Sequence, residues 1–467
     1  MSQTFAIIAA TVAVVLATII PTYYISNKQK TTGEDWTIAN RSLPTYVVVG
    51  TQFASVFGGG IMVGHLGNAY QNGIGVLIYG VIMVLPFVFL SIIAKWIRQN
   101  QFATIPDILG KYTDNNKGIK LIASLMTMLF PLGWITSQIT AFGSIFSSLT
   151  GLDYTVLCLI FSAVALFFIM PAGLKTVAWT DFFFACFMGI ILLVSMYYGT
   201  EMAGGVSKIV AAADPALISW RGSIEKLGWG TIFLWFFAVL PGGMTNQMYF
   251  QRICAMKDEK KVIGNLIISA VVSLIGFGWA VYMGIAISTL NTELGRNAVT
   301  GWFMSKLPLW HLALFAAVLF AAMMSTVSSA VQSMAVNVAH DMMSVINPDM
   351  TEKQTLTLSR ITCVAIMIFS LVMCLKFTDT LAWLVAMNAF SAAALFCPIF
   401  IGYALRKKNV VTSAGIASGM ICGAIGTTVG MVMHTAVNYA AIGILFSLVG
   451  MLTVCALTRK KEISVIK

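Results

Sequence analysis

The chain has 467 residues, of which 58% are hydrophobic and only 10% are charged. A soluble protein carries about 25% charged residues, so the composition excludes a soluble globular protein. It indicates an all-α polytopic membrane protein, since helices satisfy their own backbone hydrogen bonds in lipid. The formal net charge of +11 suggests nucleic-acid binding, but the distribution of the basic residues argues against it.

Apolar segments follow one another along the whole chain, separated by short polar connections. A bilayer-spanning helix needs about 20 mostly apolar residues, and this criterion predicts about 13 spans in one membrane domain. The first segment has no preceding basic residue and no cleavage site after it, which favours a membrane helix over a signal peptide. The predicted spans cover residues 5–25, 45–70, 74–96, 121–150, 155–172, 176–199, 228–249, 262–287, 310–338, 358–376, 381–404, 411–432 and 436–457.

The basic residues predict the orientation of these spans. When the N-terminus is placed outside, 22 of the 28 Lys and Arg residues, including Arg252 and Lys257, fall on the cytoplasmic side. This bias follows the positive-inside rule, so it explains the positive charge without nucleic acid. We therefore expect a plasma-membrane protein with a cytoplasmic C-terminus. The outer side keeps Lys208, Arg221, Lys226, Arg296, Lys306 and Lys376.

The cysteines and histidines do not form a recognisable site in the sequence. None of the eight cysteines belongs to a Cys-x-x-Cys pair, which argues against a disulfide framework or a zinc site. The four histidines, among them His340 and His434, are scattered, and we assign them no role.

Two predicted spans carry helix-weakening residues in their middle. Gly58–Gly60 lie within 45–70, and Pro241–Gly243 lie within 228–249. Glycine weakens a helix by about 1 kcal/mol relative to alanine, and proline removes a backbone donor. Close helix packing by small residues is an alternative explanation for the glycines alone, but the matching interruption in the second span favours two broken helices.

The two interruptions lie five spans apart and define two units, residues 45–199 and 228–404. An odd number of spans inverts the second unit in the membrane, and paired interruptions are typical of transporters with inverted repeats. Residues 5–25 would then precede the repeats as an extra helix, and residues 411–457 would follow them as two more. Backbone groups freed at the interruptions are candidates for binding ions and substrate.

Polar side chains inside spans are rare and suggest function. Asp181 lies in the sixth span without an adjacent basic residue, so it needs a partner from elsewhere, and a bound cation would serve. Ser325, Ser328 and Ser329 share one helix face, with Thr326 beside them. The alternatives are that Asp181 caps a helix at the interface and that the hydroxyls bond to their own helix backbone.

The chain resembles the sodium:solute symporter family, which includes bacterial proline, galactose and sialic acid carriers. The resemblance covers most of the chain and rests on "DWTIANRSLP", the glycine-bearing second span, "NQMYFQRICAMKDEKK" and "AAMMSTVSSAVQS". It implies the fold of the leucine transporter, a 5+5 inverted repeat, with one extra helix in front and two behind.

The resemblance also implies where Na⁺ binds. A sodium site shared across the family would lie between the second and ninth spans, and some members hold a second sodium between the sixth and ninth spans. The first site would use the backbone carbonyls of Ala54, Phe57 and Ala322 and the hydroxyls of Ser325 and Thr326; the second would use Asp181, Ser325, Ser328 and Ser329.

The substrate region departs from that of the sugar carriers, because Val56, Gly58 and Ile61 stand where those carriers have polar side chains. A small organic solute fits this region better than a sugar, for example a carboxylate held by exposed helix amides. The candidate substrate-binding residues are Gly58, Gly59, Gly60, Gln138, Asn246, Gln247 and Asn388.

The sequence therefore predicts a sodium-coupled symporter that imports a small organic solute across the plasma membrane by alternating access, rather than an enzyme. We expect contact with membrane lipid, no nucleic acid and no obligate protein partner. The alternatives are a proton-coupled carrier with Asp181 as the proton site, and a channel or sensor on the same fold. An intramembrane enzyme would need a convergent nucleophile or metal motif such as His-Glu-x-x-His, which the sequence lacks.

Overall fold

The computed structural model describes residues 3–26, 33–169, 173–376, 380–408, 410–433 and 438–465. These residues form helices throughout, and their only strand-like pairing is a single bridge between Leu43 and Met256. The end of the predicted span 155–172, the basic residues Lys28, Lys30 and Lys467, and His434 lie outside the described residues.

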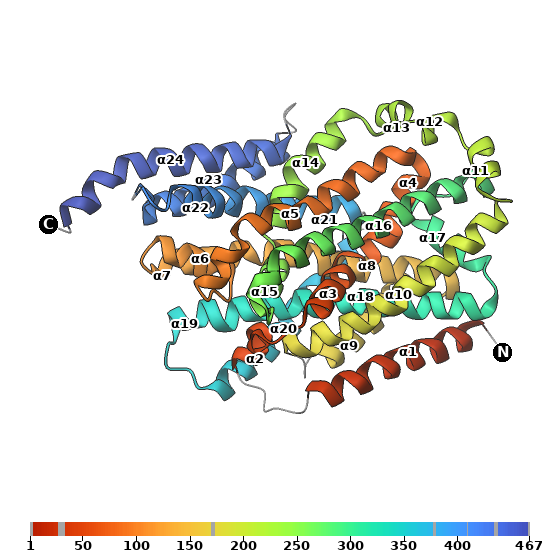
Figure 1. The fold of residues 1–467 in the computed structure, drawn as a ribbon, viewed down its shortest axis with the longest axis horizontal. Coiled ribbons are helices and arrows are strands. Elements are labelled where there is room, and N and C mark those ends of the chain that lie inside the picture. Colours follow the sequence, from red (N-terminus) through yellow and green to blue (C-terminus); the bar gives the residue numbers. More distant parts are fainter. Residues whose placement is uncertain are drawn as a thin grey trace.

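Long helices run side by side and form the body of the molecule (Figure 1). The start of α1 and the end of α24 lie at opposite ends of this body. The long helices are α1 (Gln3–Ser26), α5 (Leu77–Gln99), α8 (Leu129–Thr150), α9 (Tyr154–Ile169), α10 (Leu174–Met202), α14 (Trp229–Met244), α16 (Val262–Leu290), α18 (Leu309–Val336), α20 (Glu352–Lys376), α21 (Thr380–Phe396), α23 (Ser413–Val432) and α24 (Tyr439–Val465).

Short helices gather at the two ends of the long ones (Figure 1). The end that carries the C-terminus has α2 (Gly33–Ile38), α6 (Ile105–Tyr112), α7 (Lys117–Thr127), α19 (Met343–Ile346) and α22 (Gly402–Leu405). The opposite end has α11 (Val206–Ala212), α12 (Pro215–Ile218), α13 (Trp220–Leu227) and α17 (Val299–Ser305).

Ten described helices are long and apolar enough to cross a membrane, or eleven when the bent pair Trp220–Leu227 and Trp229–Ala255 counts as one span. The predicted count of 13 is not confirmed by this criterion. The predicted span 45–70 is divided into short pieces, and Tyr154–Ile169 has only 16 residues. This criterion counts neither 45–70 nor Tyr154–Ile169 as a separate span.

The predicted span 45–70 is interrupted at the glycines, as the sequence suggests. Helix α3 (Thr45–Val56) ends there, and Phe57 and Gly58 separate it from a π-helix over Gly60–His65. Helix α4 (Leu66–Asn72) follows and ends at a turn where Gly73 has a φ of 75°. Single π-helical turns are frequent at functional sites, and this one lies next to the interruption.

The second interruption lies a few residues beyond the predicted one. Helix α14 continues through Pro241 and ends at Met244, where the Thr245 N–H is shared between the Pro241 and Gly242 carbonyls, both at 3.1 Å. The side chain of Asn246 then accepts a hydrogen bond of 2.9 Å from Met248 N and begins α15 (Gln247–Ala255). The cap residue, rather than the proline, therefore fixes the position of the break.

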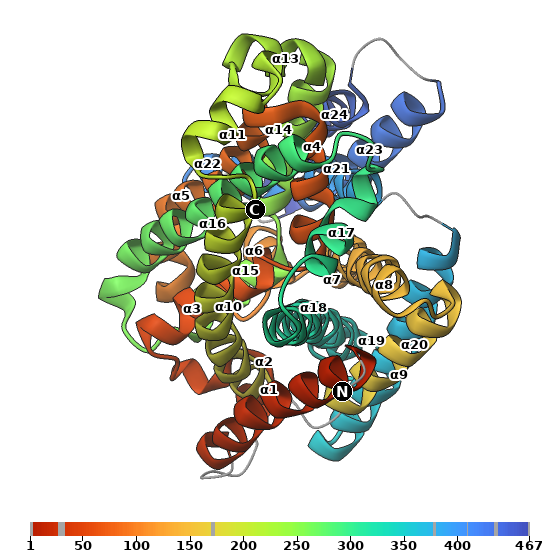
Figure 2. The same ribbon diagram turned by 90° about the vertical axis from the view of Figure 1, so that its right-hand side faces the viewer.

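The helices of the first and second halves pack in matching pairs. Helix α3 packs on α10 as α14 packs on α21, and α3 packs on α16 as α14 packs on α5. Helix α8 packs on α21 as α18 packs on α10. Helix α18 lies in the interior with α1, α8, α9 and α10 around it (Figure 2), and its residues from Ala321 to Val336 are all buried.

Candidate functional site

The first candidate site lies where α3 ends against the middle of α18. The last carbonyls of a helix have no partner within the helix, and they form the negative end of its dipole. Thr326 Oγ1 lies 3.4 Å from the carbonyl oxygens of both Ala54 and Ser55, and 3.0 Å from that of Ala322. All four residues are fully buried.

These spacings suit a small cation. An ion held by oxygens at about 2.4 Å, as Ca²⁺ is, places neighbouring ligands about 3.4 Å apart, and Na⁺ has nearly the same radius. Of the residues predicted for this site, the structure brings Ala54, Ala322 and Thr326 together. Phe57 is the C-cap residue that directly follows the last residue of α3. The carbonyl of Ser55 was missed by the sequence analysis.

A second polar cluster lies one helical turn away and is centred on Asp181 of α10. Its carboxylate accepts hydrogen bonds from Thr51 Oγ1 at 2.5 Å, from Ser329 Oγ at 3.1 Å and from Ser325 Oγ. Arg252 of α15 completes the cluster, with Nη2 at 3.3 Å from Asp181 Oδ2. Asp181 is fully buried, so these partners replace the water that a carboxylate requires.

Arg252 uses its whole guanidinium in this cluster. Nε donates to Thr51 Oγ1 at 3.0 Å, Nη1 to the Met248 carbonyl at 2.9 Å, and Nη2 to Ser55 Oγ at 2.8 Å and Ser329 Oγ at 2.7 Å. The fixed fork of an arginine is suited to such a set of acceptors. The cluster therefore ties α15 to α3, α10 and α18, across both interrupted spans.

Arg252, which the sequence counts among the charges of the cytoplasmic loops and the span ends beside them, has a fully buried side chain, so it is not a solvent-exposed loop charge. A buried acid needs a compensating charge, so the isolated Asp181 was the signal that pointed to a basic partner inside the membrane. Ser325 and Ser329 contact Asp181, but Ser328 Oγ donates to the Ser325 carbonyl of its own helix at 3.0 Å. For Ser328, and for Thr326, whose Oγ1 donates to the Ala322 carbonyl of its own helix at 3.0 Å, the backbone-bonding alternative describes the contact.

The glycines of the first interruption face Gln138 of α8. Gly59 N donates to Gln138 Oε1 at 2.6 Å, and a Cβ added at Gly58 would lie 2.6 Å from both this oxygen and Thr326 Oγ1. A Cβ at Gly60 would meet Ser137 Oγ at 3.4 Å. Glycine is thus favoured at 58, because the Gln138 amide of α8 and the Thr326 hydroxyl of α18 lie close to the backbone there.

The other candidate substrate residues divide into two groups. Asn388 of α21 lies against Gly242, and both of its side-chain amide atoms are buried without a hydrogen-bond partner among the described residues. Asn246, four residues after Gly242 in the chain, is the N-cap of α15. Gln247 points elsewhere, since its Oε1 accepts a hydrogen bond of 2.9 Å from Ile105 N at the start of α6.

Two interrupted helices with oxygen atoms gathered at a helix end, in a bundle of apolar helices, are typical of a secondary transporter. The sequence model described as "Sodium:solute symporter family" matches residues 36–423. The high-affinity proline transporter PutP of Bacillus subtilis (strain 168) is 24% identical over 432 residues, which are 86% of this chain and 87% of that protein. The sodium/proline symporter of Staphylococcus aureus is 24% identical over 416 residues, covering 84% and 79%.

Solved structures share the fold. A substrate-bound, outward-open Na⁺-coupled sialic acid symporter superposes with a TM-score of 0.83 at 18% identity, covering 98% of each chain. Mhp1, a nucleobase-cation-symport-1 family transporter in a closed conformation, superposes with a TM-score of 0.59 at 14% identity, covering 92% and 96%.

The chain belongs to the sodium:solute symporter family. It is a multi-pass membrane transporter that couples Na⁺ to the symport of a small organic solute.

Proposed function

We propose that Na⁺ binds at the junction of α3 and α18 and couples solute import to alternating access. The observation that carries this proposal is the position of Thr326 Oγ1, within 3.4 Å of the carbonyl oxygens of Ala54, Ser55 and Ala322. The Phe57 carbonyl and the Ser325 hydroxyl are the remaining proposed ligands. Because the ligands come from both α3 and α18, a bound ion would hold these helices together.

We propose that 13 spans cross the plasma membrane, with the N-terminus outside. Three spans are added to the ten when Gly60–Gln99 is divided at Gly73, so that its first part joins α3, and when the short α9 and the bent α14–α15 segment are counted. An odd number agrees with termini at opposite ends of the molecule (Figure 1). The matching helix pairs of the two halves support repeats over 45–199 and 228–404, flanked by α1 in front and by α23 and α24 behind.

A second sodium ion at Asp181, Ser325, Ser328 and Ser329 is a further part of the proposal. Arg252 already supplies the positive charge at Asp181, so the ion can bind only when Arg252 withdraws and Ser328 turns from its helix backbone. The test is the Hill coefficient for sodium-dependent uptake. A Hill coefficient above one in the parent that falls towards one in Asp181→Asn supports the second ion, provided that a change at the exposed Asp214, Asp214→Asn, leaves it unchanged. A Hill coefficient of one in the parent contradicts the second ion.

The substrate we propose is a small solute with a carboxylate, bound between Gly58–Gly60, Gln138, Asn246 and Asn388. The buried amide of Asn388, which lacks partners among the described residues, is available to such a ligand. Gln247 would lie at the border of this region, next to α6. Because curated relatives are named proline transporters, L-proline is the first solute to test.

A cavity of about 300 Å³ at the proposed outer side supports an anionic group on the solute. Lys226 and Arg296 line it together with Asn68, Trp235 and Val385. Positive charge at a cleft attracts anions, and an anionic group that enters would compete with Asp214 for Lys226. Lys226 donates a 2.7 Å hydrogen bond to Asp214, which lowers the pKa of that carboxyl.

Uptake by the purified chain in proteoliposomes tests the substrate. Labelled L-proline should accumulate under an inward sodium gradient, and an excess of unlabelled L-proline should suppress it. Gln138→Ala should weaken uptake, whereas Gln354→Ala, which removes an exposed amide bonded to Thr351, should not. Uptake of neutral amines or sugars in preference to L-proline and other small carboxylates would contradict the proposed substrate class.

A further inference from the structure

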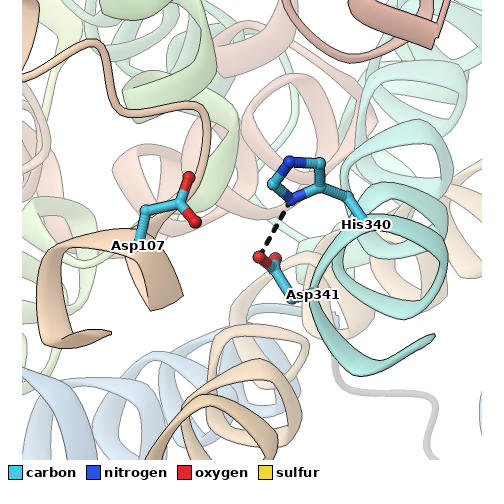
Figure 3. Close-up of side chains that lie close together, drawn as sticks. All are labelled: Asp107, His340 and Asp341. Carbon is cyan, nitrogen blue, oxygen red and sulfur yellow. Dashed lines mark hydrogen bonds and ion pairs between the residues drawn. The ribbon is translucent and has the colours of Figure 1, made fainter. Parts of the chain in front are cut away.

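Three ionisable side chains meet at the end of the molecule that carries α6 and α19, away from both sodium sites. Asp107 belongs to α6, and His340 and Asp341 belong to the π-helix that follows α18 (Figure 3). One candidate ligand atom from each side chain lies within 4.8 Å of the others. Asp107 is held in place by its role as a helix cap, since its Oδ2 accepts from the N–H groups of Ala103 at 3.0 Å and Thr104 at 3.1 Å.

Asp341 supplies independent evidence for a ligand. Its side chain is fully buried, and its Oδ1 accepts a 2.8 Å hydrogen bond from Thr104 Oγ1 and lies 3.1 Å from His340 Nδ1. Its Oδ2 has no hydrogen-bond partner among the described residues. A buried carboxylate oxygen without a partner is costly, so the cluster lacks one cation or donor.

Lys120 lies close to the cluster but does not complete it. Its ammonium is 3.7 Å from Asp107 Oδ1 and 3.6 Å from Asp341 Oδ1, which is beyond ordinary hydrogen-bond range. The side chain is one-fifth exposed and flexible. It can therefore leave the carboxylates when a stronger cation arrives.

We propose that Asp107, His340 and Asp341 bind a divalent transition-metal ion of the Zn²⁺ class, in competition with the Lys120 ammonium. One imidazole nitrogen and two carboxylate oxygens form a mixed ligand set that suits this class and leaves a fourth position for water. A cavity of about 500 Å³, lined by His340, Ala339 and Ser344, reaches the His340 side of the cluster. A bound ion would join α6 to the segment that ends α18.

The experiment is a calorimetric titration of the purified full-length chain with Zn²⁺, after removal of the affinity tag. The absorption spectrum of bound Co²⁺ serves as a second probe of the ligands. The parent should bind one Zn²⁺ ion and give the visible bands of four-coordinate Co²⁺. His340→Ala, which removes a side chain that is 41% exposed, should weaken binding about tenfold or more, as the loss of even an outer-shell partner does.

Two further variants distinguish a metal site from a simple ion-pair network. Lys120→Gln removes the competitor and should bind Zn²⁺ more tightly than the parent. Asp153→Asn, an exposed carboxylate that caps α9 elsewhere, should bind like the parent. A parent that binds no Zn²⁺, a His340→Ala variant that binds as well as the parent, or a Lys120→Gln variant without a gain in affinity would each overturn the proposal.

Discussion

Replacing Arg252 by glutamine should destabilise the protein strongly. The change removes the charge that faces the fully buried Asp181 carboxylate, together with hydrogen bonds to Thr51, Ser55 and Ser329. Breaking a buried ion pair by removing one partner costs about 3–5 kcal/mol. We expect about 3 kcal/mol, at the lower end of that range, because three hydroxyl groups still donate to Asp181.

The measurement is the free energy of unfolding in mixed micelles, followed by circular dichroism, for a double-mutant cycle. Asp181→Asn combined with Arg252→Gln removes both charges, and the double variant should recover about 2 kcal/mol relative to the sum of the single changes. The control is Arg221→Gln. Arg221 pairs with Glu225 at 3.0 Å but is 91% exposed, so its loss should cost less than about 1 kcal/mol.

Two results would refute this reasoning. If Arg252→Gln were no more destabilising than Arg221→Gln, the buried pair would not stabilise the bundle. If the two changes at Asp181 and Arg252 were additive, their charges would not interact.

Two further predictions concern the interruption and the topology. Gly58→Ala should abolish uptake, because the added Cβ would lie 2.6 Å from two side-chain oxygens. Gly189→Ala should transport normally, because nothing lies within 4 Å of the added Cβ. Equal uptake by both variants would show that the close approach at Gly58 is not needed. A cysteine at Lys260 should be labelled only from the cytoplasm and one at Lys208 only from outside, and the reverse pattern would contradict the proposed orientation.

Local rules predict those parts of the site that depend on one segment. Consecutive glycines predict the end of α3 near Gly58, and helical spacing predicts that Ser325 and Ser329 share a face, as their contacts with Asp181 show. The same rules misplace the second break, because the helix tolerates Pro241 and ends where Asn246 caps the next helix.

Long-range contacts set the remaining features, and the sequence does not reveal them locally. Arg252 follows an apolar segment and is counted as a loop charge until the fold places it beside Asp181. Gln247 accepts a hydrogen bond from the backbone of α6, which lies far from it in the chain.

Direct sodium binding tests the central claim without requiring a known substrate. Purified protein, as the parent, Thr326→Ala and Thr326→Ser, is titrated with radioactive sodium ion in a scintillation proximity assay. We predict saturable binding to the parent that unlabelled sodium displaces and potassium does not. The sodium affinity should be about tenfold lower in Thr326→Ala, since the lost hydroxyl contacts a charge. Thr326→Ser should retain the affinity of the parent. Unchanged sodium affinity in Thr326→Ala would contradict the site at the end of α3.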